Sequence, residues 1–194
     1  MIKNIAVFCV SHFAKNPLYK EVAESLGTQL AHEGRTLIYG GSAWGYMGSV
    51  SSAALNAGGF VVGIIPTFFS DAVISSQPVS ELIKVSSMAE RKQIMAQRSD
   101  AYIALPGGIG TLDEITEMLT HTQLGFGCKP TGILNVNGFY NPLKAQLELM
   151  HNEGLIQEGT MRTILFDDTI EGLLQKLDAF VAQPENEFLE KIRR

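Results

Sequence analysis

Short apolar runs alternate along this chain with longer segments in which apolar residues recur every three or four positions. Continuous apolar runs are typical of buried strands, and the longer periodic segments are typical of helices with one buried face. The runs predict strands at residues 2–10, 36–39, 60–65, 82–85, 101–105, 131–136 and 164–166. The periodic segments predict helices at residues 17–33, 49–57, 88–98, 140–150 and 170–181, and one that begins near Thr111.

This alternation predicts a doubly wound α/β fold, in which helices cover both faces of a mainly parallel sheet. The 194 residues suit one domain, with a peripheral charged tail at 184–194. Residues 67–81 have weak periodicity and are expected to form an irregular loop. In such a sheet, ligands bind at the carboxyl ends of the strands. The glycine-rich segments 40–48 and 106–110 both follow predicted strands and therefore lie at that edge.

The composition is that of an ordinary globular protein, with 45% hydrophobic and 18% charged residues. A net charge of −5 and the lack of a basic block argue against a nucleic-acid partner. Cys9 and Cys128 have no metal-binding spacing and the histidines are dispersed, so we expect no metal site. No apolar run reaches the roughly 18 residues of a membrane span, and the N-terminus lacks a signal-peptide layout. We therefore expect a cytoplasmic protein without a membrane partner.

The segment from Pro106 to Glu114 is the most informative part of the chain. Gly107, Gly108 and Gly110 lie between a predicted strand and a predicted helix. Glycines in such a turn let backbone N–H groups approach an anion, and a helix N-terminus favours negative charge. The pattern is neither a P-loop nor the dinucleotide fingerprint. A phosphate-bearing ligand is the first interpretation, and a simple tight turn is the alternative.

Glu114 has two interpretations of equal weight. Thr111 and Glu114 have the spacing of a capping box, in which the glutamate returns a hydrogen bond to the start of its own helix. Glu114 also lies off the apolar face formed by Leu112, Ile115 and Leu119, at the ligand edge of the sheet. A carboxylate at that edge is a candidate for catalysis.

The predicted helix at 88–98 carries an arginine inside an apolar stripe. Met88, Arg91 and Met95 fall on one face, and a buried arginine must find an anion or reach solvent. This placement favours a site role for Arg91. We interpret Glu90 as the partner of Ser87 in a capping box, and Lys92 as a solvated charge.

Together these segments resemble the LONELY GUY (LOG) family of cytokinin-activating phosphoribohydrolases, which is also labelled as lysine decarboxylases. The shared motifs are P-G-G-x-G-T-x-x-E at 106–114, M-A-E-R-K at 88–92, Y-G-G with G-Y-M-G between residues 39 and 48, and G-G with G-I-I-P between residues 58 and 66. The resemblance runs from about residue 5 to residue 155. It implies a Rossmann-like fold and a homodimer. The implied reaction is hydrolysis of the N-glycosidic bond of adenine-type nucleoside 5′-monophosphates to free base and ribose 5-phosphate.

The resemblance also implies roles for individual residues. Arg91 and Glu114 match the catalytic pair of the family. Met88 matches a residue that lines the base or ribose pocket, and Arg98 and Ser11 match residues near the ligand. The residues that match the 5′-phosphate site are Gly107, Gly108, Gly110 and Thr111. Our hypothesis is that Glu114 stabilises the oxocarbenium-like transition state and activates water, while Arg91 orients the ribose phosphate or assists the departing base.

The chain departs from the family pattern at several positions. After the first strand, Val10 replaces a glycine of the family and His12 replaces a serine. Ala89 replaces a histidine, and Ser42 and Tyr46 replace a glycine and a leucine. These departures keep open an alternative function, a non-catalytic nucleotide sensor or carrier on the same scaffold. They also bear on base preference, adenine or N6-modified adenine.

Decarboxylase chemistry is not expected. A pyridoxal-phosphate enzyme needs a Schiff-base lysine and a large cofactor site, and no lysine here stands in such a motif. We therefore expect no cofactor.

Overall fold

The computed structural model describes residues 2–70, 73 and 78–182, and within them one sheet organises the chain. Its seven strands are all parallel and run in the order β4-β3-β2-β1-β5-β6-β7. The strands are β1 (Asn4–Phe8), β2 (Thr36–Tyr39), β3 (Val61–Pro66), β4 (Glu81–Val85), β5 (Ala101–Ala104), β6 (Thr131–Leu134) and β7 (Ile164–Asp167). The predicted α/β fold with a parallel sheet is confirmed.

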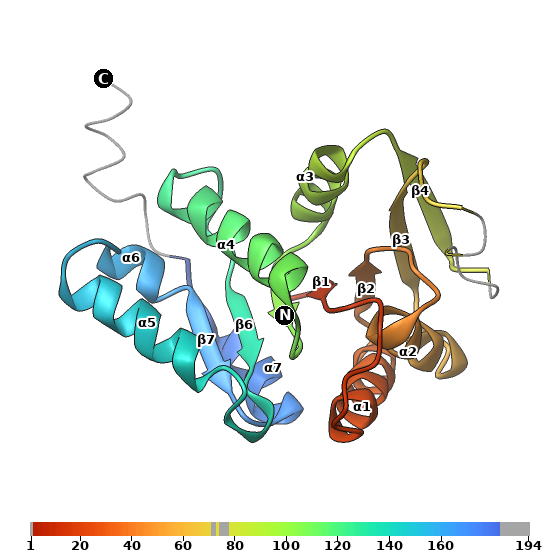
Figure 1. Ribbon diagram of the computed structural model, residues 1–194, viewed down its shortest axis with the longest axis horizontal. Coiled ribbons are helices and arrows are strands. Elements are labelled where there is room, and N and C mark those ends of the chain that lie inside the picture. Colours follow the sequence, from red (N-terminus) through yellow and green to blue (C-terminus); the bar gives the residue numbers. More distant parts are fainter. Residues whose placement is uncertain (1, 71–72, 74–77, 183–194) are drawn as a thin grey trace.

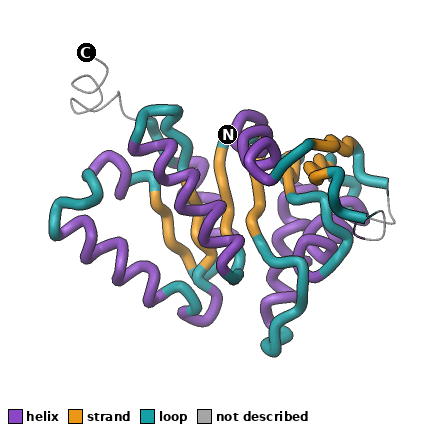
Figure 2. The backbone as a smooth tube through the Cα atoms, turned by 45° about the horizontal axis from the view of Figure 1, so that its top comes forward, coloured by secondary structure: helices purple, strands orange, loops and turns teal. Residues whose placement is uncertain are grey.

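Helices cover both faces of the sheet, as Figures 1 and 2 show. One face carries α1 (Leu18–His32), α2 (Gly45–Asn56) and α7 (Ile170–Ala179), whose apolar residues join one buried cluster. The other face carries α3 (Met88–Arg98), α4 (Ile109–Gln123), α5 (Asn141–Asn152) and the short α6 (Glu158–Met161), which join a second cluster. The strands supply alternate residues to the two clusters, so the sheet is buried on both sides. No helix among the described residues is long and apolar enough to cross a membrane.

The strand order places a topological switch point at the centre of the molecule. The chain builds outward from β1 through β2, β3 and β4, and then returns to pair β5 with the other side of β1. The connections that follow β1 and β5 therefore diverge onto opposite faces, and in doubly wound sheets the ligand crevice lies at the carboxyl ends of such strands. This topology positions the candidate site.

The structure adjusts several predicted boundaries. β1 is shorter than the predicted strand at 2–10, and α2 begins at Gly45, four residues before its predicted start. α6 was not predicted, because a helix of four residues is too short to show periodicity. Part of the predicted loop at 67–81 and the tail at 184–194 lie outside the described residues.

The closest helix packing joins α1 to α2. A Cβ atom added at Gly27 would lie 2.2 Å from the carbonyl oxygen of Val50, so only glycine permits this approach. Both residues are buried. The close approach of α1 to α2 therefore depends on the missing side chain at Gly27.

We predict that Gly27→Ala lowers the free energy of unfolding by about 1–3 kcal/mol, because the added methyl group forces the two helix backbones apart. Urea denaturation monitored by circular dichroism measures this change. The exposed Ser25 on the same helix provides the control, and Ser25→Ala should stay within about 0.5 kcal/mol of the wild type. Equal stabilities for the two variants would contradict the packing constraint.

Candidate active site

The second glycine-rich segment forms an open helix N-terminus at the crevice. α4 begins after Gly108, which provides no side-chain cap. The backbone N–H groups of Ile109, Gly110 and Thr111 donate no hydrogen bond to another described residue. The Thr111 hydroxyl is buried there without a partner, although buried hydroxyls nearly always have one. An anion would satisfy the N–H groups and the hydroxyl together.

Packing against α4 and a hydrogen bond from Tyr140 hold this turn in place. A Cβ atom at Gly107 would lie 2.2 Å from Thr111 Oγ1, so the turn and the helix pack without space between them. The Tyr140 hydroxyl donates to the carbonyl of Leu105 at 2.7 Å, just before the turn. The Tyr140 N–H in turn donates to Asn135 Oδ1 at 2.7 Å. The turn is therefore fixed from the next strand connection.

The first glycine-rich segment, residues 40–48, does not offer an equivalent site. The carbonyl of Val10 accepts hydrogen bonds from the N–H groups of Tyr46 (3.0 Å) and Met47 (3.3 Å). Val10 thus occupies the N-terminus of α2, where an anion would otherwise bind. The N–H groups of Tyr46 and Met47 at the start of α2 thus have a partner within the protein, whereas those of Ile109, Gly110 and Thr111 at the start of α4 have none among the described residues.

A buried ion pair joins α3 to α4 beside this turn. Arg91 Nη2 lies 3.1 Å from Glu114 Oε1, and each side chain is only 6% exposed. The guanidinium lies over Gly40, where a Cβ atom would approach Nη2 to 2.0 Å. Arg91 Nη1 contacts the sulfur of Met88 at 3.6 Å, and the buried Nε has no partner. Of the two alternatives that the sequence left for this arginine, an anion or solvent, the structure shows an anion.

Burial changes the acidity of Glu114. Loss of solvent raises its pKa from 4.5 to about 7, against the opposing effect of Arg91. The negative charges of Asp113 and Glu117 add to the increase, and Lys92 opposes it. Glu114 can therefore gain or release a proton near neutral pH, as acid–base catalysis requires.

The structure excludes the capping interpretation of Glu114. The N-cap of α4 is Gly108, so Thr111 already lies inside the helix and its hydroxyl caps nothing. The Glu114 carboxylate pairs with Arg91. The local pattern was misleading because the helix begins two residues earlier than predicted.

Two neighbouring predictions on α3 need correction. Ser87 caps α3 by accepting from the Glu90 N–H at 3.1 Å, as expected, but the Glu90 carboxylate accepts from the N–H and hydroxyl of Ser86. Lys92 is not a solvated charge. Its side chain is 13% exposed and pairs with Asp113 at 2.9 Å and with Glu117.

Three predicted ligand residues lie at different places. Met88, at the start of α3, is part-exposed and contacts Arg91, so it borders the ion pair. Ser11 is exposed just beyond β1, at the edge that carries the turn. Arg98 ends α3 and pairs with Glu81 at 2.7 Å, at the amino end of β4. The structure does not bring Arg98 to the crevice, and its ligand role stays a prediction.

Sequence reasoning missed the position of Cys9 near the ion pair and the contact of Tyr140 with the segment before the glycine turn. Cys9 was predicted to be buried, and it is, but it also lies close enough to Glu114 and Arg91 for their charges to act on it. Burial and the nearby Glu114 carboxylate raise the pKa of the Cys9 thiol, so it stays neutral. The support from Tyr140 depends on a contact across 35 residues, for which local spacing holds no signal.

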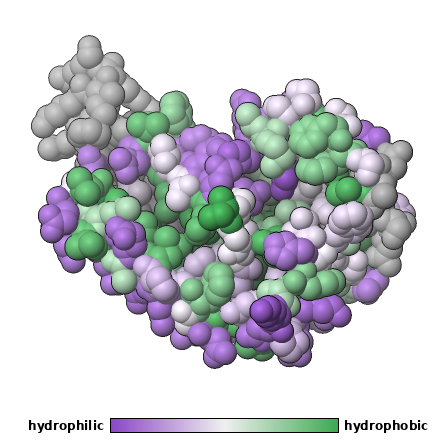
Figure 3. All heavy atoms as spheres, in the orientation of Figure 1, coloured by the Kyte–Doolittle hydropathy of each residue, from purple (hydrophilic) through white to green (hydrophobic). Residues whose placement is uncertain are grey.

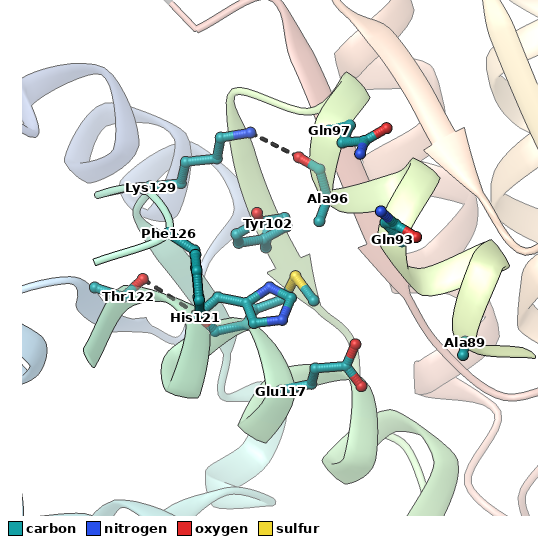
Figure 4. A pocket seen from close by; sticks show the side chains of 12 residues that line it. Ala89, Gln93, Ala96, Gln97, Tyr102, Glu117, His121, Thr122, Phe126 and Lys129 are labelled. Atoms are coloured by element: carbon teal, nitrogen blue, oxygen red, sulfur yellow. Dashed lines mark hydrogen bonds between the residues drawn. The ribbon is translucent and has the colours of Figure 1, made fainter. Parts of the chain in front are cut away.

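A separate groove of about 620 Å³ runs between α3 and α4. Figure 4 shows Tyr102, His121 and Phe126 together on one side and Gln93 and Gln97 of α3 on the other. Neither Arg91 nor Glu114 lines it. Among the residues that the structure describes, no cluster of three or more His, Cys, Asp or Glu side chains could hold a metal ion.

Comparisons with known proteins agree with this geometry. A family model described as "Possible lysine decarboxylase" matches residues 47–177. The cytokinin riboside 5′-monophosphate phosphoribohydrolase LOG of Oryza sativa subsp. japonica is 41% identical over 94% of this chain and 76% of its own length. The phosphoribohydrolase LOG1 of Arabidopsis thaliana is 40% identical over 94% of this chain and 86% of its own. This chain belongs to the LOG family.

Solved structures extend the similarity of fold beyond the LOG family. A molybdenum cofactor binding protein of Rippkaea orientalis superposes with a TM-score of 0.67 and 24% identity, over 92% of this chain and 97% of that one. The molybdenum cofactor carrier protein of Chlamydomonas reinhardtii gives a TM-score of 0.67 and 23% identity, over 92% and 99%. At this identity the likeness shows the fold alone.

The departures from the LOG pattern have structural partners. A Cβ atom at Gly108 would lie 3.9 Å from Val10 Cγ1, so the Val10 side chain lies beside the glycine turn at the start of α4. Tyr46 is buried, and its hydroxyl accepts from the Ala14 N–H at 2.9 Å while its ring packs against Phe13. Both substitutions therefore shape the segment after β1.

We predict that the Glu114 carboxyl titrates near pH 7 in the folded protein, which carbon-detected NMR of glutamate-labelled protein can measure. Its raised pKa means that the folded state binds the proton more tightly, so its contribution to stability is full below pH 4.5 and is lost as pH rises through about 7. The free energy of unfolding of the wild type relative to Glu114→Gln should fall by about 2 kcal/mol from about pH 5 to about pH 8. Parallel stability curves for the two proteins would contradict the raised pKa.

Proposed function

We propose that this protein hydrolyses the N-glycosidic bond of adenine-type nucleoside 5′-monophosphates, releasing free base and ribose 5-phosphate. The observation that carries the proposal is the buried pair of Arg91 and Glu114 beside a helix N-terminus that has no side-chain cap and holds an unpartnered Thr111 hydroxyl. Membership of the LOG family supports it, since the relatives are named as phosphoribohydrolases of cytokinin riboside 5′-monophosphates.

The spacing along α4 suits a nucleotide. Gly108, Gly110 and Thr111 would hold the 5′-phosphate at the helix N-terminus. Glu114 follows Thr111 by three residues, about 4.5 Å along the helix axis. A ribose attached to that phosphate would therefore lie over the Glu114 carboxylate.

The chemistry then needs few groups. As the bond from C1′ to the base breaks, positive charge develops on the ribose ring, and the Glu114 carboxylate stabilises it. Water adds to C1′ and passes a proton to Glu114, while the base leaves with the bonding electrons and takes up a proton from solvent. Glu114 then releases its proton to solvent, so that one water molecule is consumed and the carboxylate is restored. Arg91 favours the ionised carboxylate and orients the ribose phosphate. Asp113 and Glu117 are committed to Lys92, so neither is free to act as the acid.

The wider setting rests on the resemblance. We infer a homodimer in the cytoplasm, without cofactor or metal, acting on AMP, on N6-modified adenine nucleotides, or on both. Met88 at the border of the ion pair would line the base or ribose pocket.

A non-catalytic nucleotide sensor or carrier is the alternative, because Val10 stands beside the phosphate turn where the family has glycine. A crowded turn could hold a nucleotide in a pose that does not react. The two functions differ in whether binding is followed by release of base.

We predict that the wild-type protein releases free base from AMP or from N6-isopentenyl-AMP. Chromatography of the reaction mixture measures the released base. Glu114→Gln should reduce kcat at least about a hundredfold while nucleotide binding persists, because the amide cannot stabilise positive charge or accept a proton. Glu148→Gln, at an exposed position on α5, is the matched control and should keep full activity. Binding of both nucleotides without release by the wild type would favour the sensor, and full activity of Glu114→Gln would reject the catalytic role.

We also predict that Thr111→Val raises KM about tenfold with little change in kcat, since it removes one hydrogen bond to a charged phosphate. Steady-state kinetics with AMP and with inorganic phosphate as a competitor measure this effect. Thr116→Val on the same helix is the control, because the exposed Thr116 hydroxyl bonds only to the helix backbone in the described structure. An unchanged KM for Thr111→Val would place the phosphate elsewhere.

A further inference from the structure

A second cluster of charges bridges α3 and α4 next to the Arg91–Glu114 pair. Lys92 follows Arg91 on α3, and its ammonium group lies between two carboxylates of α4. It pairs with Asp113 at 2.9 Å and with Glu117. In Figure 3, which has the orientation of Figure 1, hydrophilic residues gather in the upper middle of the view, where α4 lies beside α3.

The two clusters form consecutive links between the same helices. Arg91 and Lys92 are adjacent on α3, and their partners Glu114 and Asp113 are adjacent on α4. The 620 Å³ groove lies between these helices farther along, with Glu117 at its border. Because open space separates the helices there, the ionic links fix their relative position where the carboxylate must act.

Lys92 is held as a cation. Its side chain is 13% exposed, and although burial opposes the charged form, the bonds to Glu117 and Asp113 raise the pKa of Lys92. The charged groups acting on Glu114 are Arg91 and Lys92 from α3 and Asp113 and Glu117 from its own helix, and the neutral Cys9 thiol lies nearby, directly after β1. Lys92 therefore offsets two carboxylates that would otherwise favour a protonated Glu114.

We propose that Lys92 is a positioning residue, which holds α3 against α4 and, by neutralising Asp113 and Glu117, keeps the neighbouring Glu114 carboxylate ionised for catalysis. The proposal rests on the proposed hydrolysis and adds a group that does not touch the substrate. It accounts for a lysine that is mostly buried and paired with two carboxylates beside the candidate catalytic pair.

The direction of the pH profile tests the proposal. Activity that needs ionised Glu114 rises with pH through an acidic limb in kcat/KM. In Lys92→Met the loss of one positive charge leaves two carboxylates uncompensated, and the limb should move up by about half a pH unit or more. In Asp113→Asn one negative charge is lost, and the limb should move down. Lys92→Arg should restore the wild-type profile.

A purely structural role would give another pattern. It would lower activity in Lys92→Met at every pH and leave the limb in place, which would overturn the proposal. Movement of the limb in the same direction in Lys92→Met and Asp113→Asn would also overturn it. The Asp113 side chain is 56% exposed, so we expect Asp113→Asn to fold. It keeps the test valid if Lys92→Met fails to fold. Lys20→Met, which removes an exposed lysine paired with Glu24 on α1, is the control and should keep the wild-type limb.

A second readout separates this proposal from the proposed function. NMR titration of the Glu114 carboxyl, assigned with Glu114→Gln, follows its ionisation without turnover. Opposite shifts in Lys92→Met and Asp113→Asn support the role of Lys92 in setting that ionisation even if the wild type releases no base, a result that would reject the hydrolase alone. Unchanged titration in both variants rejects the role of Lys92 whatever the activity.

Discussion

The site depends on an ion pair that the fold places out of water. Taking Arg91 and Glu114 from solvent costs free energy that their single contact does not fully return, and the raised pKa of Glu114 is the sign of that cost. The surroundings are arranged to hold the pair despite it. Gly40 leaves room for the guanidinium, and α3 and α4 are linked a second time by Lys92. A nucleotide bound at the α4 N-terminus, as proposed, would meet charges already in position.

The sequence predicted the fold well because its signal is repeated in every segment. The buried strands of a parallel sheet are continuous apolar runs, and α3 was predicted with its observed bounds because a capping serine and an apolar stripe agree. Arg91 could be chosen from the same stripe, since an arginine on a buried face needs a partner. Residue spacing alone did not identify the anion that pairs with Arg91. The resemblance to the LOG family indicated Glu114.

The remaining details depend on contacts between distant segments. The local sequence predicts an exposed Lys92. Its side chain is mostly buried because α4 brings Asp113 and Glu117 beside it. The local sequence also allows Glu114 to be a capping residue, because it follows Thr111 by the three residues of a capping box. The observed start of α4 at Ile109 is not marked by a capping side chain. Such features arise from tertiary packing, which overrides local preference where the two compete.

The hydrogen bond from Tyr140 to Leu105 ties the site to a late part of the chain. Every residue of the shared glycine motif has been synthesised by residue 114, yet the side chain that holds the turn lies after β6. A nascent chain ending after α4 would contain the complete motif without the support for its geometry. During synthesis the motif is therefore complete before the residue that supports its geometry has been added, and the proposed ligand site is expected to form only once the chain extends past β6.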